Sequence, residues 1–196
     1  IKRLLGLGIE DLQIIRANNS ELARFNGMFM DRIARERGMN EIANLVDFSE
    51  RSDGRASIIL HKYSNPGIIR KLMRHRASLF MTDAWVEPGD HQNPSAYGCF
   101  PRFLQIAREE KTISMEEAVR KMTGATADRM GLDNRGYIKE KMAADITVFD
   151  PARIRDNNTV ERGNLRPDGI EVVFINGARA LHKGIAAAKS VAGDII

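Results

Sequence analysis

The spacing of hydrophobic residues predicts helices in the first quarter of the chain. Between Leu22 and Asp47, apolar side chains recur at helical intervals, and Gly38 divides the pattern into two segments. Glycine readily adopts the left-handed conformation that ends a helix, and asparagine is a preferred N-cap residue. The pattern therefore predicts one helix that ends near Gly38 and a second helix that Asn40 caps.

Two short apolar runs follow, at residues 56–64 and 77–82, and each has the continuous hydrophobic centre typical of a strand buried on both faces. Between them, Asn65 and Pro66 have the residue types of an N-cap and a first helical position. A strand, a helix and a second strand joined by short connections favour a parallel sheet. The pattern predicts α/β architecture for this part of the chain.

Helices are predicted again between residues 101 and 131. Pro101 can open one helix, and Ser114 with Glu117 forms a capping box that begins the next. Gly124 is expected to stop that helix, and Gly131 is expected to end a further short one.

The character of the chain changes near Leu132, where strand patterns replace helical ones. Ile146 and Val148 alternate with polar neighbours, as in a half-buried strand. Asn176 and Gly177 lie between two apolar runs and predict a tight β-hairpin, because both residue types accept positive φ. The pattern divides the chain into an α/β part and a smaller β part.

Composition narrows the function classes. The chain has 196 residues, of which 43% are hydrophobic, so it can form a core. Its net charge of +4 makes nucleic acid a partner to consider. However, acidic residues are interleaved with the basic ones, and no cluster of basic residues with aromatic residues occurs. No apolar run is long enough to span a membrane. We therefore expect neither nucleic acid nor a membrane as a partner.

The single cysteine indicates the cellular compartment, and the first residues indicate whether the chain is part of a longer protein. One cysteine, Cys99, excludes an intrachain disulfide and fits a reducing compartment, so we expect a cytoplasmic protein. The chain begins without Met, inside what has the pattern of an element, and we expect a fragment or a processed chain. Cys99 has no histidine at a catalytic spacing, so we interpret it as a small packing residue.

Two polar residues follow the predicted strands. Asp83 comes directly after residues 77–82, and a carboxylate at the end of a parallel strand is either a functional group or the cap of the next turn or helix. His61 also falls at the end of a strand. It either lines the same end of the sheet as Asp83, or it is a hydrogen-bonded histidine at a strand edge with no functional role. No H-x-H, H-E-x-x-H or C-x-x-C occurs, so the chain holds no complete zinc site by motif.

The order of residues from Thr82 onward resembles the C-terminal part of the N-acyl-D-amino-acid deacylases, members of the amidohydrolase superfamily. The family pattern has Ser-Asp-Gly, a loop, His-Pro-Arg-x-Tyr-Gly-x-Phe-Pro-Arg, then Leu-Ser-x-Glu-Glu-Ala-x-x-Lys-Met-Thr, a short spacer and Arg-x-Gly-Leu. Separate blocks of this pattern match the chain in order and spacing. The matching residues are Asp83, Pro94, Tyr97, Gly98, Phe100, Pro101, Arg102, Ser114, Glu116, Glu117, Ala118, Lys121, Met122 and Thr123.

The resemblance implies the C-terminal part of a (β/α)8 metal-dependent hydrolase barrel, with part of a small β-sandwich. Residues 1–132 would belong to the barrel, including a helical insertion at about 20–50, and residues 133–196 to the sandwich. Asp83 would act on a metal-bound water as base and then protonate the leaving nitrogen. Ser95, Tyr97 and His61 would contact the substrate. Zinc or another divalent metal is implied, with its main ligands absent from this chain.

One departure from the family pattern concerns the substrate. Ser95 stands where the family has an arginine, and a guanidinium pairs with the carboxylate of an acylated amino acid in a way that serine cannot. A neutral or cyclic amide therefore stays open as the substrate beside an N-acyl amino acid.

The sequence thus predicts the C-terminal portion of an amidohydrolase that cleaves C–N bonds other than peptide bonds. This portion would be inactive alone and would be completed by the N-terminal part of the same protein or by a partner chain. The alternative is a non-catalytic folded fragment that functions in association.

Overall fold

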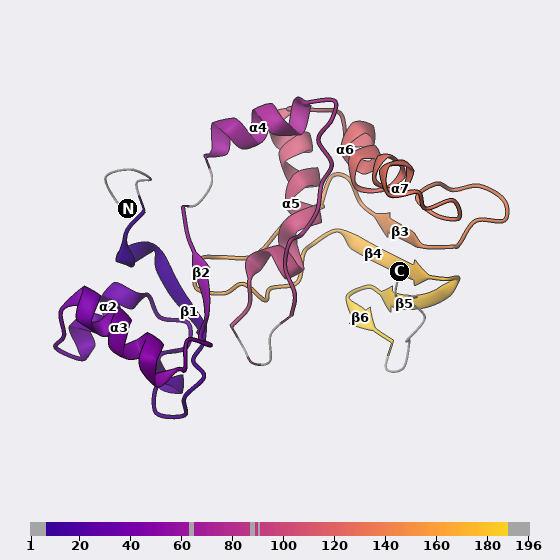
Figure 1. Cartoon of the computed structure of the whole chain (residues 1–196). Helices are drawn as coiled ribbons and strands as arrows, with labels where there is room; N and C mark the ends of the chain where they lie inside the picture. The colour runs from indigo at the N-terminus through magenta and orange to yellow at the C-terminus, as the bar shows by residue number, and fades with distance from the viewer. Residues whose placement is uncertain (1–6, 63–64, 87–88, 90, 188–196) are drawn as a thin grey trace. The chain divides into compact units, whose positions relative to one another are not determined.

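The structure is a computed structural model of the chain, and it describes residues 7–62, 65–86, 89 and 91–187 (Figure 1). These residues form two compact units. The first comprises the described residues up to Ile68, with Ala84–Ala96 and Thr159–Asn164; the second comprises Ile69–Asp83, Tyr97–Asn158 and the described residues from Leu165 onward.

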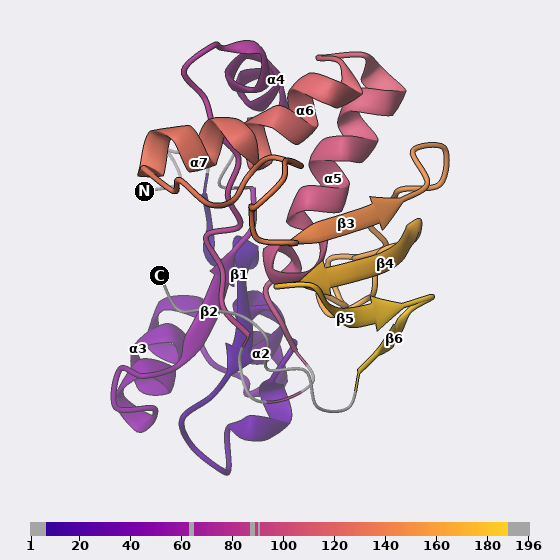
Figure 2. The same ribbon diagram turned by 90° about the vertical axis from the view of Figure 1, so that its right-hand side faces the viewer.

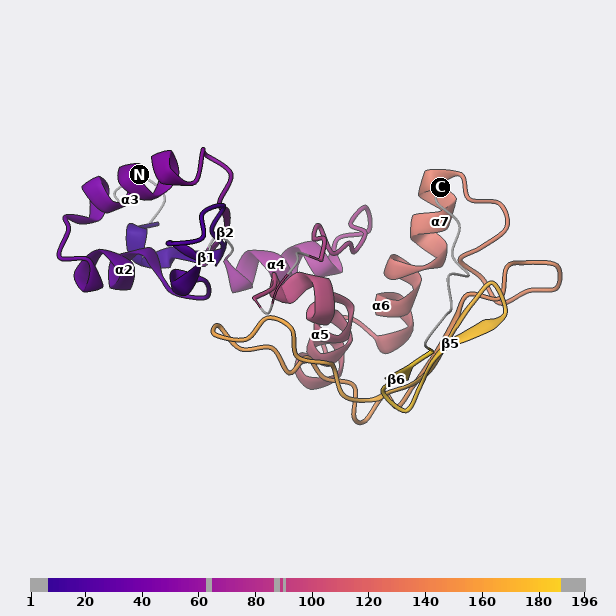
Figure 3. The same cartoon turned by 90° about the horizontal axis from the view of Figure 1, so that it is seen from below.

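The first unit packs two helices against a two-stranded sheet. Its elements are η1 (Ile9–Asp11), β1 (Leu12–Arg16), η2 (Ala23–Phe25), α2 (Met30–Glu36), α3 (Glu41–Arg51) and β2 (Ser57–Leu60). Helices α2 and α3 lie beside each other (Figure 3). Fully buried apolar side chains, among them Ile14, Phe25, Ile33 and Phe48, form the core. Strand β1 was missed in the sequence pattern.

The helix boundaries around Gly38 confirm the local prediction. The side chain of Asn40 accepts hydrogen bonds from the backbone N–H groups of Ile42 and Ala43, at 3.0 and 3.4 Å. Gly38 has a φ of 63°, the left-handed value that glycine accepts without strain. The helical region differs from the predicted range of Leu22 to Asp47 at both ends. Residues 23–25 form a 3₁₀ turn, and α3 continues to Arg51.

The expected parallel strand pair is not formed, and this prediction was wrong. Strand β2 pairs antiparallel with β1, so that Leu60 lies opposite Leu12. Residues 77–82 form no strand, although Phe80 N–H donates a hydrogen bond of 3.4 Å to the carbonyl of Lys121. An apolar run becomes a strand only where a neighbouring strand satisfies its backbone hydrogen bonds, and among the described residues the segment 77–82 has no such neighbour.

The helix between these runs is confirmed. Helix α4 spans Pro66–Arg74, and the side chain of Asn65 accepts from the N–H groups of Gly67 and Ile68 at 2.8 and 3.2 Å. The remaining elements are α5 (Pro94–Glu110), α6 (Met115–Met122), α7 (Gly124–Met130), β3 (Ile146–Phe149), β4 (Ile170–Ile175), β5 (Ala178–His182) and β6 (Ile185–Ala186).

Helix α5 begins seven residues earlier than predicted. It starts at Pro94, and Pro101 lies inside it. The side chain of Asn93 accepts from the N–H of Ser95 at 3.0 Å, so Asn93 and Pro94 are the same cap-and-proline pair that begins α4. Pro101 lies in the interior of α5, where it has no N–H to donate and its ring crowds the carbonyl of Tyr97, four residues earlier.

The other helix ends follow the sequence signals, with one exception at Gly124. Ser114 Oγ accepts from the N–H of Glu117 at 3.1 Å, which confirms the cap of α6. Gly131 caps the end of α7 with a φ of 69°, as predicted. Gly124 does not stop α6, because α6 ends at Met122 with Thr123 as its cap and Gly124 begins α7.

The β part is a four-stranded antiparallel sheet in the order β3-β4-β5-β6 (Figure 2). Asn176 and Gly177 form the turn between β4 and β5 with φ values of 46° and 79°, which confirms the hairpin. Val148 is exposed rather than half-buried, because the register shifts between Val148 and Phe149.

The core of the second unit lies between its helices and this sheet. Its buried apolar members are Met73, Phe80, Leu104, Ile106, Ala107, Ala118 and Ile154. The rings of Phe80 and Phe103 stack with their centroids 4.1 Å apart. Among the described residues, no helix has the length and apolar character needed to cross a membrane.

The cap of α3 provides a test of the local structure. We expect Asn40→Ala to lower the free energy of unfolding by about 1 kcal/mol, since two N–H groups lose their acceptor. Asn40→Asp keeps an acceptor oxygen and should lose much less. Chemical denaturation of both variants checks this, and equal losses would show that the side-chain hydrogen bonds do not cause the effect.

Candidate active site

Asp83 is an exposed carboxylate at the end of a tethered segment. Its φ is 45°, in the left-handed region that aspartate tolerates better than most residues. Among the described residues, its carboxylate neither caps a helix nor pairs with a cation. The interpretation of Asp83 as a cap therefore finds no support in the structure.

Lys121 holds the backbone that leads to Asp83. Its side chain is 1% exposed, and Nζ donates to the carbonyls of His75 and Ser78 at 2.6 and 2.9 Å. Glu117 lies 3.8 Å from the same ammonium. A buried ammonium is stable only when its N–H groups find acceptors, and here the acceptors belong to the segment before Asp83.

Cys99 of α5 holds the same segment closer to Asp83. Its Sγ donates to the carbonyl of Met81 at 3.1 Å. Burial, with the negative charge of Asp156 as the smaller cause, raises the pKa of the Cys99 thiol to about 11. The thiol therefore stays protonated at neutral pH, and its contact with a backbone carbonyl agrees with a packing role rather than a nucleophilic one.

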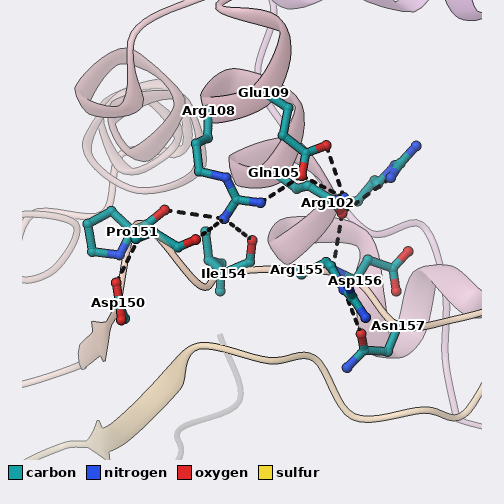
Figure 4. Close-up of polar contacts among 11 residues, drawn as sticks. Arg102, Gln105, Arg108, Glu109, Asp150, Pro151, Ile154, Arg155, Asp156 and Asn157 are labelled. Atoms are coloured by element: carbon teal, nitrogen blue, oxygen red, sulfur yellow. Dashed lines mark hydrogen bonds and ion pairs between the residues drawn. The ribbon is translucent and has the colours of Figure 1, made fainter.

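Helix α5 is anchored by polar contacts to the loop that follows β3 (Figure 4). Arg108 donates to the carbonyls of Pro151, Ala152 and Ile154, at 3.3, 2.9 and 2.8 Å. Gln105 accepts from the N–H of Asp156 at 3.3 Å.

Close packing extends these anchors toward the start of the helix. Near Tyr97, Gly98 packs so closely that a Cβ there would lie 2.1 Å from Asp156 Oδ1. These contacts fix the position of Tyr97, which is half-buried, and of Cys99.

His61 lies at the end of β2 in the first unit. Its Nε2 is 2.8 Å from Gln13 Oε1, and its ring centroid is 5.1 Å from that of Phe29. Burial lowers the pKa of His61, while the charges of Asp11 and Glu161 act in the opposite direction. The neutral imidazole is therefore the form that the site favours at neutral pH.

Ser95 also belongs to the first unit, in the first turn of α5, where its N–H is bound by Asn93. Asp83 and Tyr97 belong to the second unit. Among the described residues, no hydrogen bond joins any two of the four predicted side chains, which are Asp83, Ser95, Tyr97 and His61. Their assignment to one site stays a prediction.

The residues present do not form a metal centre by themselves. Within the described part of the chain, no three His, Cys, Asp or Glu side chains gather closely enough to hold an ion. We therefore assign no metal ligand to this chain.

Two polar residues of these regions were missed in the sequence. Lys121 lies in the Lys-Met-Thr motif, but its burial could not be deduced from a pattern that resembles a solvated helix face. Gln13 lies in β1, the strand that was not predicted, and it carries no motif. Only the contacts in the folded chain identify either residue.

The fold and these residues define the class of the protein. The model of the Amidohydrolase family matches residues 22–180, and the chain belongs to this family. The predicted fold class, the C-terminal part of a hydrolase barrel with part of a β-sandwich, agrees with the solved relatives below.

Three relatives illustrate the likeness. A D-aminoacylase from Alcaligenes xylosoxydans xylosoxydans is 32% identical over 78% of this chain and 30% of its own length. A structure of D-aminoacylase, solved to study its binuclear metal centre, is 27% identical with a TM-score of 0.79 and covers 98% of this chain and 38% of its own. The chain thus spans about a third of these proteins.

A third likeness concerns the fold alone. The N-acyl-D-glutamate deacylase of Bordetella bronchiseptica, solved with zinc and a phosphonate inhibitor, has a TM-score of 0.82 over 100% of this chain and 39% of its own, at 23% identity.

The raised pKa of Cys99 predicts slow alkylation. With a pKa of about 11, only about one-thousandth of the thiol is ionised at pH 8, so iodoacetamide should react far more slowly than with an ordinary cysteine. The rate should climb with pH towards that value. The urea-unfolded chain serves as the control, and equal rates for folded and unfolded chains at pH 8 would contradict the burial of Cys99.

Proposed function

We propose that this chain is the C-terminal portion of a metal-dependent amidohydrolase that hydrolyses amide C–N bonds other than peptide bonds, as an N-acyl-amino-acid deacylase does. The family match over residues 22–180 and the likeness to D-aminoacylase support this proposal. The chain covers about a third of these relatives, so the activity is assigned to the whole protein that contains it.

The observation that carries the proposal is the exposed carboxylate of Asp83 at the end of a backbone segment fixed by Lys121. An ionised carboxylate held at a defined position can accept a proton from the attacking water. The protonated carboxyl can then donate that proton to the leaving nitrogen, which departs as a neutral amine. Asp83 would therefore act as general base and then as general acid.

The solved relatives contain metal, since D-aminoacylase has a binuclear metal centre and the N-acyl-D-glutamate deacylase was solved with zinc. We infer that zinc or another divalent ion serves this protein, held by residues outside the described ones. Such an ion supplies positive charge that polarises the amide carbonyl and activates water. No residue of this chain is given a ligand role.

The substrate side of the proposal rests on Ser95, Tyr97 and His61. An acylated amino acid carries a carboxylate, and Ser95 offers a hydroxyl where the family has an arginine. Our proposal therefore covers two substrate classes, an N-acyl amino acid and a neutral or cyclic amide. The proposed division places residues 1–132 in the barrel and 133–196 in the sandwich, and the proposed location is the cytoplasm.

Replacement of Asp83 tests the catalytic role. In the full-length, metal-loaded protein, we expect Asp83→Asn to lower kcat for amide hydrolysis by at least about 10²-fold, because the amide cannot accept the proton. Asp53 is a matched control, since it is also exposed and has a φ of 51°. Asp53→Asn should keep full activity. Unchanged turnover in the Asp83 variant would remove the proposed role.

Replacement of Ser95 tests the substrate class. We expect Ser95→Arg to raise kcat/KM for an N-acyl amino acid by about tenfold relative to a neutral amide, because a guanidinium pairs with the carboxylate. Ser95→Lys, which adds charge without the planar fork, should give a smaller change. If the arginine variant leaves the ratio of the two kcat/KM values unchanged, Ser95 does not face the carboxylate position.

A further inference from the structure

Gln13 is a buried polar residue that none of the proposed chemistry uses. It lies in β1, is 3% exposed, and belongs to the same unit as His61. Its amide nitrogen Nε2 donates to the carbonyl of Gly27 at 2.9 Å and to the carbonyl of Val160 at 3.1 Å. Both hydrogens of the carboxamide are therefore engaged by backbone oxygens.

These two contacts determine the orientation of the carboxamide. If the amide nitrogen and oxygen exchanged places, the oxygen would face the carbonyl oxygens of Gly27 and Val160. Three hydrogen-bond acceptors would then lie together with no hydrogen between them, which is unfavourable. The oxygen Oε1 must therefore point the other way, where it lies 2.8 Å from Nε2 of His61. Since Oε1 can only accept, the hydrogen between them belongs to the histidine.

The ring of His61 is also held in place by its surroundings. Its backbone N–H donates to the carbonyl of Asp11 at 2.8 Å, and Phe29 lies against the ring. A neutral imidazole carries one hydrogen, so a hydrogen on Nε2 leaves the lone pair on Nδ1. Among the described residues, Nδ1 makes no hydrogen bond. The fold thus presents an acceptor nitrogen on a ring whose other nitrogen is fixed.

We propose that Gln13 is a positioning residue that fixes His61 as the Nε2–H tautomer, so that Nδ1 accepts a hydrogen bond from the N–H group of the amide substrate. This inference rests on the proposed function for its substrate, because it assigns the contact of His61 to the amide N–H. The tautomer itself rests only on the contacts of Gln13. An amide substrate should gain this hydrogen bond, whereas the matching ester, which has no N–H, should not.

The tautomer is tested by ¹⁵N NMR of the histidine side chains in the full-length protein. We expect the wild type to show a protonated Nε2 and an unprotonated Nδ1 for His61 at neutral pH. Gln13→Leu should produce a mixture of tautomers. Gln13→Met, which keeps the length of the side chain but offers His61 no acceptor oxygen, should produce a mixture as well. If leucine disrupts the fold, the methionine variant and the wild-type spectrum still decide the question.

A matched control is Gln105→Leu, because Gln105 is another buried glutamine, located in the second unit. It should leave the His61 spectrum unchanged. An Nδ1–H tautomer in the wild type, or a His61 spectrum unaffected by either Gln13 variant, would overturn the positioning role.

The substrate contact is tested by kinetics with an amide and its ester analogue. We expect Gln13→Leu to raise KM for the amide by up to about tenfold with little change in kcat, and to leave KM for the ester unchanged. Equal effects on both substrates would overturn the contact with N–H. If the enzyme hydrolyses neither substrate while NMR finds the fixed tautomer, the proposed function fails and the role of Gln13 stands.

Discussion

The position of Asp83 depends on one buried charge. The ammonium of Lys121 leaves water only because the carbonyls of His75 and Ser78 accept its hydrogens. These carbonyls follow the end of α4, where the helix dipole places partial negative charge, so the ion and the helix end stabilise each other. Without the lysine side chain, the two carbonyls would need other donors, and the segment 77–82 would keep only the backbone hydrogen bond from Phe80 N–H as its polar link to α6.

Local chemistry explains which parts of the fold were predictable. The cap of α3 at Asn40 and the turn at Asn176 depend on contacts within a few residues, so the sequence alone determines them. The start of α5 was misplaced because two prolines compete for it, although only Pro94 follows an asparagine cap. The segment 77–82 has the composition of a strand, but a strand also requires a partner that sequence composition cannot supply.

The candidate site also has residues that the sequence predicts and residues that only the folded chain reveals. Asp83 and His61 were found because each follows an apolar run, and the family motif added Ser95 and Tyr97. The two residues that support Asp83 and His61 were not found in the sequence. Lys121 contacts carbonyls 43 and 46 residues away, and Gln13 contacts carbonyls 14 and 147 residues away. Such contacts leave no period or motif, and an interior lysine cannot be told from a solvated one by its neighbours in sequence.

The apolar side chains near Asp83 bear on how the carboxylate could work. Met81 is 66% exposed and Trp85 is 75% exposed, so water reaches both sides of Asp83 in this chain. Proton transfer to a leaving nitrogen is most effective where water is excluded and charges act at short range. Under the proposed function, the parts of the protein that this chain does not span would cover these side chains. Asp83 would then be positioned by this chain, and its environment would be completed by the rest of the protein.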